Sequence, residues 1–107
     1  MKKSILVIAS HPDDEVIGCG ASIARHIFEG DDVGVITLTN GVASREGSAS
    51  VDAINRLNAA TNAMSSLGAT WLGCGDFPDN KIDSVPLIEV VKFIESFKKS
   101  FYPDIIY

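Results

Sequence analysis

The sequence predicts an α/β fold in which helices cover both faces of a parallel sheet. Strand-like and helix-like segments alternate along the chain, which is the pattern of a sheet built from successive crossover units. The first strand-like segment, "SILVIA" at 4–9, is a continuous apolar run, as expected of a strand buried on both faces. Helix-like segments separate the strands, so right-handed crossovers should make neighbouring strands run parallel.

The first half of the chain contains two strands and one helix. The helix spans 14–29 and ends at Gly30, a residue type that suits the position after a helix. A second strand, "DVGVITLT", follows at 32–39, and the small and polar segment at 40–50 is a loop. The side chains expected to face the core from this helix are Val16, Ile17, Ile23, Ile27 and Phe28.

The second half repeats this alternation. A helix at 51–67 stops at Gly68, "ATWLGCG" at 69–75 is a third strand, and 76–83 is a loop. A third helix is expected at 85–99, and "PDIIY" begins a fourth strand. The side chains expected to face the core are Val51, Ile54, Leu57 and Met64 in the second helix and Leu87, Val90, Val91, Ile94 and Phe97 in the third.

Composition indicates one globular domain and argues against several kinds of partner. The 107 residues allow a single core, and 46% of them are apolar. A net charge of −5 with scattered lysines and arginines leaves no basic surface for nucleic acid. No segment approaches the ~20 apolar residues that span a bilayer. Cys19 and Cys74 are far apart and are expected to be free thiols of a cytoplasmic protein.

Three loops should open onto one edge of the sheet, because the carboxyl ends of parallel strands lie together. They are 10–15, 40–50 and 76–83, and they carry nearly all of the residues suited to chemistry. The last strand offers a different surface. Ile105 and Ile106 would leave an exposed strand edge, through which a homo-oligomer could form.

The stretch "ASHPDDEVIGCG" at 9–20 admits three interpretations. Acids at a helix N-terminus complement the helix dipole, which accounts for one or two of them. Paired aspartates after a first strand also hold Mg²⁺ in receiver domains, where Asp76 would imitate the phosphate acceptor. A metal hydrolase accounts for the histidine as well. His11 and Asp14 can converge on one Zn²⁺, and Asp13 between them can act as a general base.

Together with later segments, this stretch resembles the PIG-L/LmbE-like family of zinc-dependent N-acetylglucosamine de-N-acetylases. The resemblance rests on "SILVIASHPDDEVIGCGASIARHIFEGDDVGVITLTNG", on Arg56 with "SLGA", and on "FPDNKIDS" and "YPDIIY". It implies a Rossmann-like three-layer sandwich with a parallel sheet. Residues 1–107 would form the N-terminal portion of a single deacetylase domain, truncated after the fourth strand.

The resemblance also implies roles for individual residues. His11 and Asp14 would be zinc ligands, and Asp13 would be the general base that deprotonates the attacking water. Arg45 and Asp79 would contact the substrate, an N-acetylated amino sugar. Arg56 is expected in a helix-surface or internal ion pair rather than on the substrate.

Two features depart from the family pattern. The family's third zinc ligand is a histidine after the fourth strand, where this chain ends, and a family glutamate is replaced by Ala59. His26 cannot supply the missing ligand, because it lies about 18 Å beyond Asp14 along the same helix; it is expected at the surface near the helix end.

We therefore expect a zinc-dependent hydrolase that removes the N-acetyl group from an N-acetylglucosamine-type sugar conjugate. The 107-residue chain alone is expected to be weakly active or inactive, because it provides two of the three protein ligands usual in a catalytic zinc site. The alternative is a non-catalytic binding or receiver-like signalling domain with an acidic metal pocket.

Overall fold

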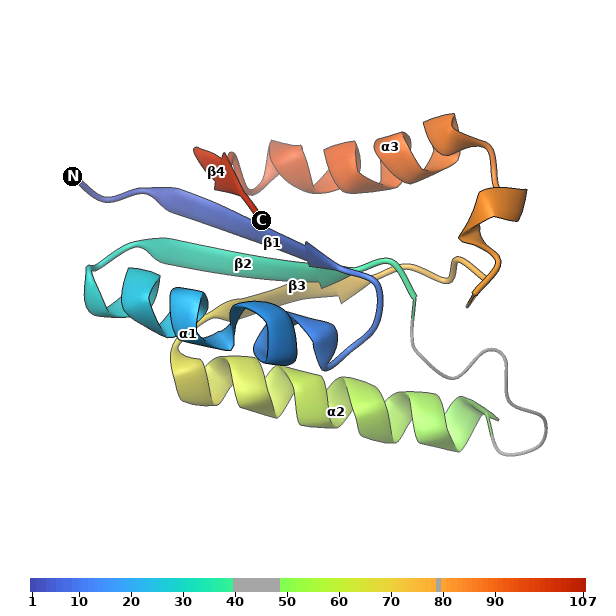
Figure 1. Ribbon diagram of the computed structural model, residues 1–107, viewed down its shortest axis with the longest axis horizontal. Coiled ribbons are helices and arrows are strands. Elements are labelled where there is room, and N and C mark those ends of the chain that lie inside the picture. Colours follow the sequence, from blue (N-terminus) through green and yellow to red (C-terminus); the bar gives the residue numbers. More distant parts are fainter. Residues whose placement is uncertain (40–48, 79) are drawn as a thin grey trace.

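The four strands form one parallel sheet, as the sequence predicts. Figure 1 shows a computed structural model, which describes residues 1–39, 49–78 and 80–107, with the backbone alone at 49, 50, 52 and 53. The strands are β1 (Ser4–Ala9), β2 (Asp32–Thr37), β3 (Thr70–Cys74) and β4 (Ile105–Ile106). Their order across the sheet is β3-β2-β1-β4, and each neighbouring pair runs parallel.

Helices cover both faces of this sheet, which confirms the predicted α/β sandwich. α1 (Asp14–Phe28) and α2 (Ala49–Leu67) pack on one face, and α3 (Leu87–Ser96) lies on the other (Figure 1). Two short 3₁₀ turns, η1 (Ile82–Ser84) and η2 (Phe97–Lys99), flank α3. Within the described ranges, no helix has the length and apolar character needed to cross a membrane.

The third helix is shorter than predicted. Pro86 has φ −54° and ψ 131°, an extended conformation, so the helix begins after it at Leu87 rather than at 85. After Ser96 the chain tightens into η2, which replaces the last turn expected before 99. The ring of Phe93 meets Phe77 and Phe97 edge to face, with centroid distances of 5.4 and 5.2 Å, and attaches α3 to the end of the sheet.

The main core lies between the sheet and the layer formed by α1 and α2. Its buried members are Ile5, Val7, Ile23, Val33, Val35, Met64 and Ala69. The inward faces predicted for the helices are only partly right, because seven of those side chains are exposed: Val16, Ile17, Phe28, Val51, Ile54, Leu87 and Val91. In α2 the reason is visible in Figure 1: its first turns extend beyond the carboxyl ends of the strands. The apolar side chains of these turns therefore have no sheet to pack against.

The strand order identifies the edge at which a ligand would bind. Chain connections run outward from β1 in one direction to β2 and β3, whereas β4 lies on the other side of β1. The point at which the order reverses is therefore next to β1, and ligands of open α/β sheets bind there, outside the carboxyl ends of the strands. Backbone bonds from Leu38 N–H to the Ala9 carbonyl and from Gly75 N–H to the Thr37 carbonyl, each 2.9 Å, hold these ends together.

β4 forms one edge of the sheet, as expected. Ile105 and Ile106 pair with β1, and Tyr107 N–H continues the ladder to the Leu6 carbonyl at 2.9 Å. The side chain of Ile106 is 54% exposed. Association of two copies through this edge stays a prediction.

Candidate active site

His11 and Asp14 are brought together by the turn that joins β1 to α1. Asp14 is the first residue of α1, and its Oδ2 lies 3.2 Å from the Nδ1 of His11. The same Oδ2 accepts the backbone N–H of His11 at 3.2 Å, which fixes the carboxylate against the turn. Two ligands about 2.1 Å from a tetrahedral zinc ion are about 3.4 Å apart. The imidazole and carboxylate atoms are therefore of the right kind and spacing to share one ion.

Asp13 has an unusual backbone. Its φ of 113° and ψ of −37° lie outside the regions that L-residues prefer, and such a conformation costs about 1–3 kcal/mol. Hydrogen bonds hold it on both sides of the Cα atom. Its N–H donates to Oε2 of Glu15 at 3.0 Å, and its carbonyl accepts the N–H groups of Val16 and Ile17, each at 3.0 Å. Strain of this kind, maintained by surrounding contacts, is concentrated at functional sites.

The carboxylate of Asp13 is held by Arg56 of α2. Nη2 of Arg56 donates to Oδ2 of Asp13 at 2.9 Å and to the Pro12 carbonyl at 3.4 Å. The ion pair predicted for Arg56 is thus present, and its partner is the residue expected to be the general base. The side chains are 30% exposed in Arg56 and 62% exposed in Asp13, so the carboxylate is accessible from solvent.

Glu15 is buried, which the sequence did not predict. An acid in the first turn of a helix normally lies in solvent, but Glu15 is 1% exposed and its Oε1 has no hydrogen-bond partner within the described residues. Burial raises the pKa of the Glu15 carboxyl; the N–H groups of Glu15 and Asp13 oppose the rise, and the negative charges of Asp13 and Asp14 add to it. The desolvation of such a group costs on the order of several kcal/mol.

A surface hollow of about 370 Å³ lies beside these acids. Asp13 and Glu15 line one part of it, and small side chains of α2 line another: Ala59, Ala60 and Ala63. Ala59 is the position at which the sequence departs from the family's glutamate. The short side chain therefore leaves the space between α1 and α2 open next to Asp13.

Hydroxyl groups of β2 and of the residues after it bond to the carboxyl end of β1 and to each other. The hydroxyl of buried Thr39 donates to the Ser10 carbonyl at 2.9 Å, and that of Thr37 donates to the Thr39 carbonyl at 3.0 Å. Asp76 follows β3 and is exposed. Burial raises the pKa of the Cys74 thiol, and the charge of Asp76 adds to this rise. Cys19 and Cys74 are both free thiols, as predicted.

Arg45 and Asp79, the two residues expected to contact the substrate, lie outside the described residues. Their proposed roles therefore rest on the sequence alone.

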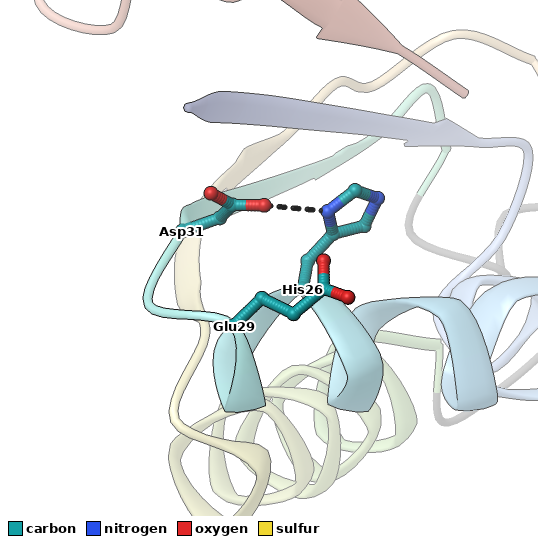
Figure 2. Close-up of side chains that lie close together, drawn as sticks. All are labelled: His26, Glu29 and Asp31. Atoms are coloured by element: carbon teal, nitrogen blue, oxygen red, sulfur yellow. Dashed lines mark hydrogen bonds and ion pairs between the residues drawn. The ribbon is translucent and has the colours of Figure 1, made fainter. Parts of the chain in front are cut away.

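A second group of ligand-type side chains lies at the opposite end of α1. His26, Glu29 and Asp31 bring three ligand atoms within 4.8 Å of one another. Figure 2 shows the imidazole of His26 turned toward Asp31, and its Nδ1 lies 2.7 Å from Oδ2 of that carboxylate. His26 is at the helix end, as predicted, and its side chain is partly buried, with 14% of it exposed.

The partners in this second group account for its presence without a metal. Because a carboxylate only accepts, Nδ1 of His26 donates to Asp31, and Nε2 lies 3.1 Å from the hydroxyl of Tyr107. The other oxygen of Asp31 accepts the N–H of Lys3 at 2.9 Å, and Glu29 pairs with Arg25 at 2.6 Å. These bonds tie the end of α1 to Lys3, which precedes β1, and to Tyr107, which follows β4.

Comparison with known proteins finds a family and relatives that are all described as deacetylases. The family described as "PIG-L: GlcNAc-PI de-N-acetylase" matches residues 6–107. The uncharacterized deacetylase YaiS of Escherichia coli (strain K12) is 30% identical over 102 residues, which cover 95% of this chain and 52% of that protein. The 1D-myo-inositol 2-acetamido-2-deoxy-α-D-glucopyranoside deacetylase of Rhodococcus opacus (strain B4) is 34% identical over 93 residues, covering 74% of this chain and 32% of that protein.

A solved structure is similar in fold as well. The N,N'-diacetylchitobiose deacetylase from Pyrococcus horikoshii superposes with a TM-score of 0.74 at 28% identity, covering 97% of this chain and 39% of that one. The chain thus spans about half the length of one of these relatives and about a third of the other two.

Proposed function

The chain belongs to the PIG-L family of de-N-acetylases, and we propose that its β1–α1 turn is the catalytic part of a zinc-dependent sugar N-deacetylase. The reaction would be hydrolysis of the N-acetyl amide of an N-acetylglucosamine-type conjugate, giving acetate and the free amine. The observation that carries the proposal is the approach of His11 and Asp14, at 3.2 Å, with Asp13 between them in a strained conformation. Relatives described as sugar deacetylases support the substrate class.

His11 and Asp14 would hold the metal through imidazole nitrogen and carboxylate oxygen, a donor set that suits zinc. A zinc ion bound there would supply a Lewis acid that polarises the amide carbonyl. A catalytic zinc usually has three protein ligands, so a third would come from outside residues 1–107. We accordingly propose that the chain is the N-terminal portion of a larger deacetylase domain and has little or no activity alone.

Asp13 would act as the general base. It would accept a proton from the water whose oxygen attacks the acetyl carbonyl, and the departing nitrogen must then gain a proton as the carbon–nitrogen bond breaks. Arg56 would orient this base, because its guanidinium donates to the Asp13 carboxylate at 2.9 Å. Arg45 and Asp79 remain proposed contacts to the sugar.

The receiver-like alternative is not favoured by the topology. A receiver has the strand order 2-1-3-4-5, in which β3 lies next to β1. Here β3 pairs with β2, and β4 lies next to β1. The order corresponds to the first four strands of a Rossmann-type sheet, and the matched relatives are deacetylases rather than signalling domains. A cytoplasmic location stays a prediction from the two free cysteines.

The proposal is tested by acetate release from the full-length gene product. N-acetylglucosamine glycosides of inositol and of a second N-acetylglucosamine unit are incubated with the zinc-loaded protein and with protein stripped by a chelator. Acetate and free amine should appear in equal amounts with zinc only, and His11→Ala should abolish both. Metal-independent release, or phosphorylation of an aspartate by acetyl phosphate without any deacetylation, would refute the proposal.

A further inference from the structure

Glu15 is placed where a simple helix-capping acid would not be. Acids of the first helical turn complement the dipole equally well from the surface, as Asp14 does with its side chain 50% exposed. Glu15 is instead 1% exposed, with one carboxylate oxygen left without a partner in the described parts of the chain. A buried acid so incompletely bonded is not explained by stability. Within the part of the chain that the structure describes, its side chain makes one bond to another residue, and this bond shows what Glu15 does instead.

That bond fixes the backbone of Asp13. Oε2 of Glu15 accepts the Asp13 N–H at 3.0 Å, while the helix fixes the Asp13 carbonyl through Val16 and Ile17. The positive φ of 113° turns the Asp13 side chain to the Arg56 guanidinium at 2.9 Å. Without an acceptor at Oε2, the N–H of Asp13 would be unpartnered and the strained φ would have no support on that side.

We propose that Glu15 is the positioning residue of the site: by accepting the Asp13 N–H, its buried side chain holds Asp13 in the conformation in which it serves as base. The inference rests on the proposed function, since it assigns Asp13 the role of base. Glu15 itself touches neither substrate nor metal in this account. The required property is a hydrogen-bond acceptor at Oε2.

The surroundings of Glu15 allow this property to be separated from charge and from packing. Glutamine has the shape of glutamate, so its amide oxygen can take the place of Oε2 beside the Asp13 N–H. Glu15→Gln therefore keeps an acceptor for the Asp13 N–H and removes the charge. Glu15→Met keeps a side chain of similar size, removes the acceptor, and ends the cost of burying a carboxylate.

The experiment compares both variants with the wild type in the zinc-loaded full-length protein. Glu15→Gln should retain near wild-type kcat, whereas Glu15→Met should lose about 10- to 100-fold in kcat with KM little changed, because the base is misplaced. Glu15→Met should nevertheless unfold at the wild-type temperature or above. Glu29→Met, the same change at the exposed residue that directly follows α1, should match the wild type in kcat.

Amide hydrogen exchange of the metal-free protein gives a readout independent of activity. The Asp13 N–H should be protected in the wild type and in Glu15→Gln, and should exchange faster in Glu15→Met. A folded Glu15→Met with wild-type kcat and a protected Asp13 amide would overturn the inference, as would loss of kcat in Glu15→Gln equal to that in Glu15→Met. If the wild type releases no acetate, the proposed function fails, and the exchange data still decide whether Glu15 holds Asp13.

Discussion

Replacing Asp13 by asparagine separates the chemistry of the site from its structure. Asparagine has the same shape, accepts the Arg56 hydrogen bond through its amide oxygen, and tolerates positive φ better than most residues. Its backbone N–H can still donate to Glu15. The substitution therefore removes the ability of this side chain to take a proton and changes little else.

The expected magnitudes differ sharply between stability and activity. The pair of Asp13 and Arg56 joins side chains that are 62% and 30% exposed, and such a pair contributes about 0.2–1 kcal/mol. The free energy of unfolding should therefore fall by about 1 kcal/mol at most. Loss of a general base lowers kcat by about 10²- to 10⁴-fold, which corresponds to about 2.7–5.4 kcal/mol in the activation barrier.

The assay measures acetate release, zinc content and urea unfolding on the same full-length preparations. Asp13→Asn should keep the wild-type zinc content, because the proposed ligands are His11 and Asp14, while kcat falls by the amount above. Asp83→Asn, which removes an exposed acid in η1, should change none of the three quantities. Equal loss of zinc and activity would refute the role of Asp13 as base, and so would a kcat close to that of the wild type.

Two further predictions concern the scaffold. The hydrogen bonds from His26 and then from Lys3 N–H lower the pKa of Asp31 below its ordinary 3.8, so they stabilise the fold above that pH and lose effect as pH falls through the lowered value. The difference in unfolding free energy between wild type and Asp31→Asn, measured in urea, should be larger at pH 5 than at pH 2.5, with the decrease below pH 3.8; an equally large difference at pH 2.5 would contradict this. Gly75→Ala would place a Cβ 2.7 Å from the Leu38 carbonyl oxygen, a backbone atom that cannot move without disturbing the strand. Thermal denaturation should therefore show that the free energy of unfolding falls by about 1–3 kcal/mol. An unchanged melting temperature would show that the strand ends are less tightly held.

The parts of the site that follow from local geometry could be predicted from the sequence. A strand ending before "HPDDE" and a helix starting within it bring positions three apart together, so the approach of His11 and Asp14 required no knowledge of the rest of the fold. The parallel sheet followed from the alternation of strand and helix periods. Each of these predictions used only patterns formed by residues that are close in sequence.

The remaining features depend on how the elements pack. An ion pair was expected for Arg56, but its partner Asp13 is 43 positions away, and the pairing depends on how α1 and α2 lie on the sheet. Helical periodicity identified an apolar stripe in α2 but not where the sheet beneath it ends, so Val51 and Ile54 were wrongly placed in the core. The sequence signal for the burial of Glu15 is local but was recognised only from the structure. An acid two positions after the aspartate that precedes the helix can accept the N–H of that aspartate.

Anomalous diffraction at the zinc absorption edge shows whether the β1–α1 turn holds a metal. Crystals of the full-length protein grown with zinc should give a peak about 2.0–2.2 Å from both Nδ1 of His11 and a carboxylate oxygen of Asp14. No peak is expected at His26, Glu29 and Asp31, whose bonds to Tyr107, Arg25 and Lys3 form part of the scaffold. Zinc bound at that second group, with none between His11 and Asp14, would contradict the proposed metal site.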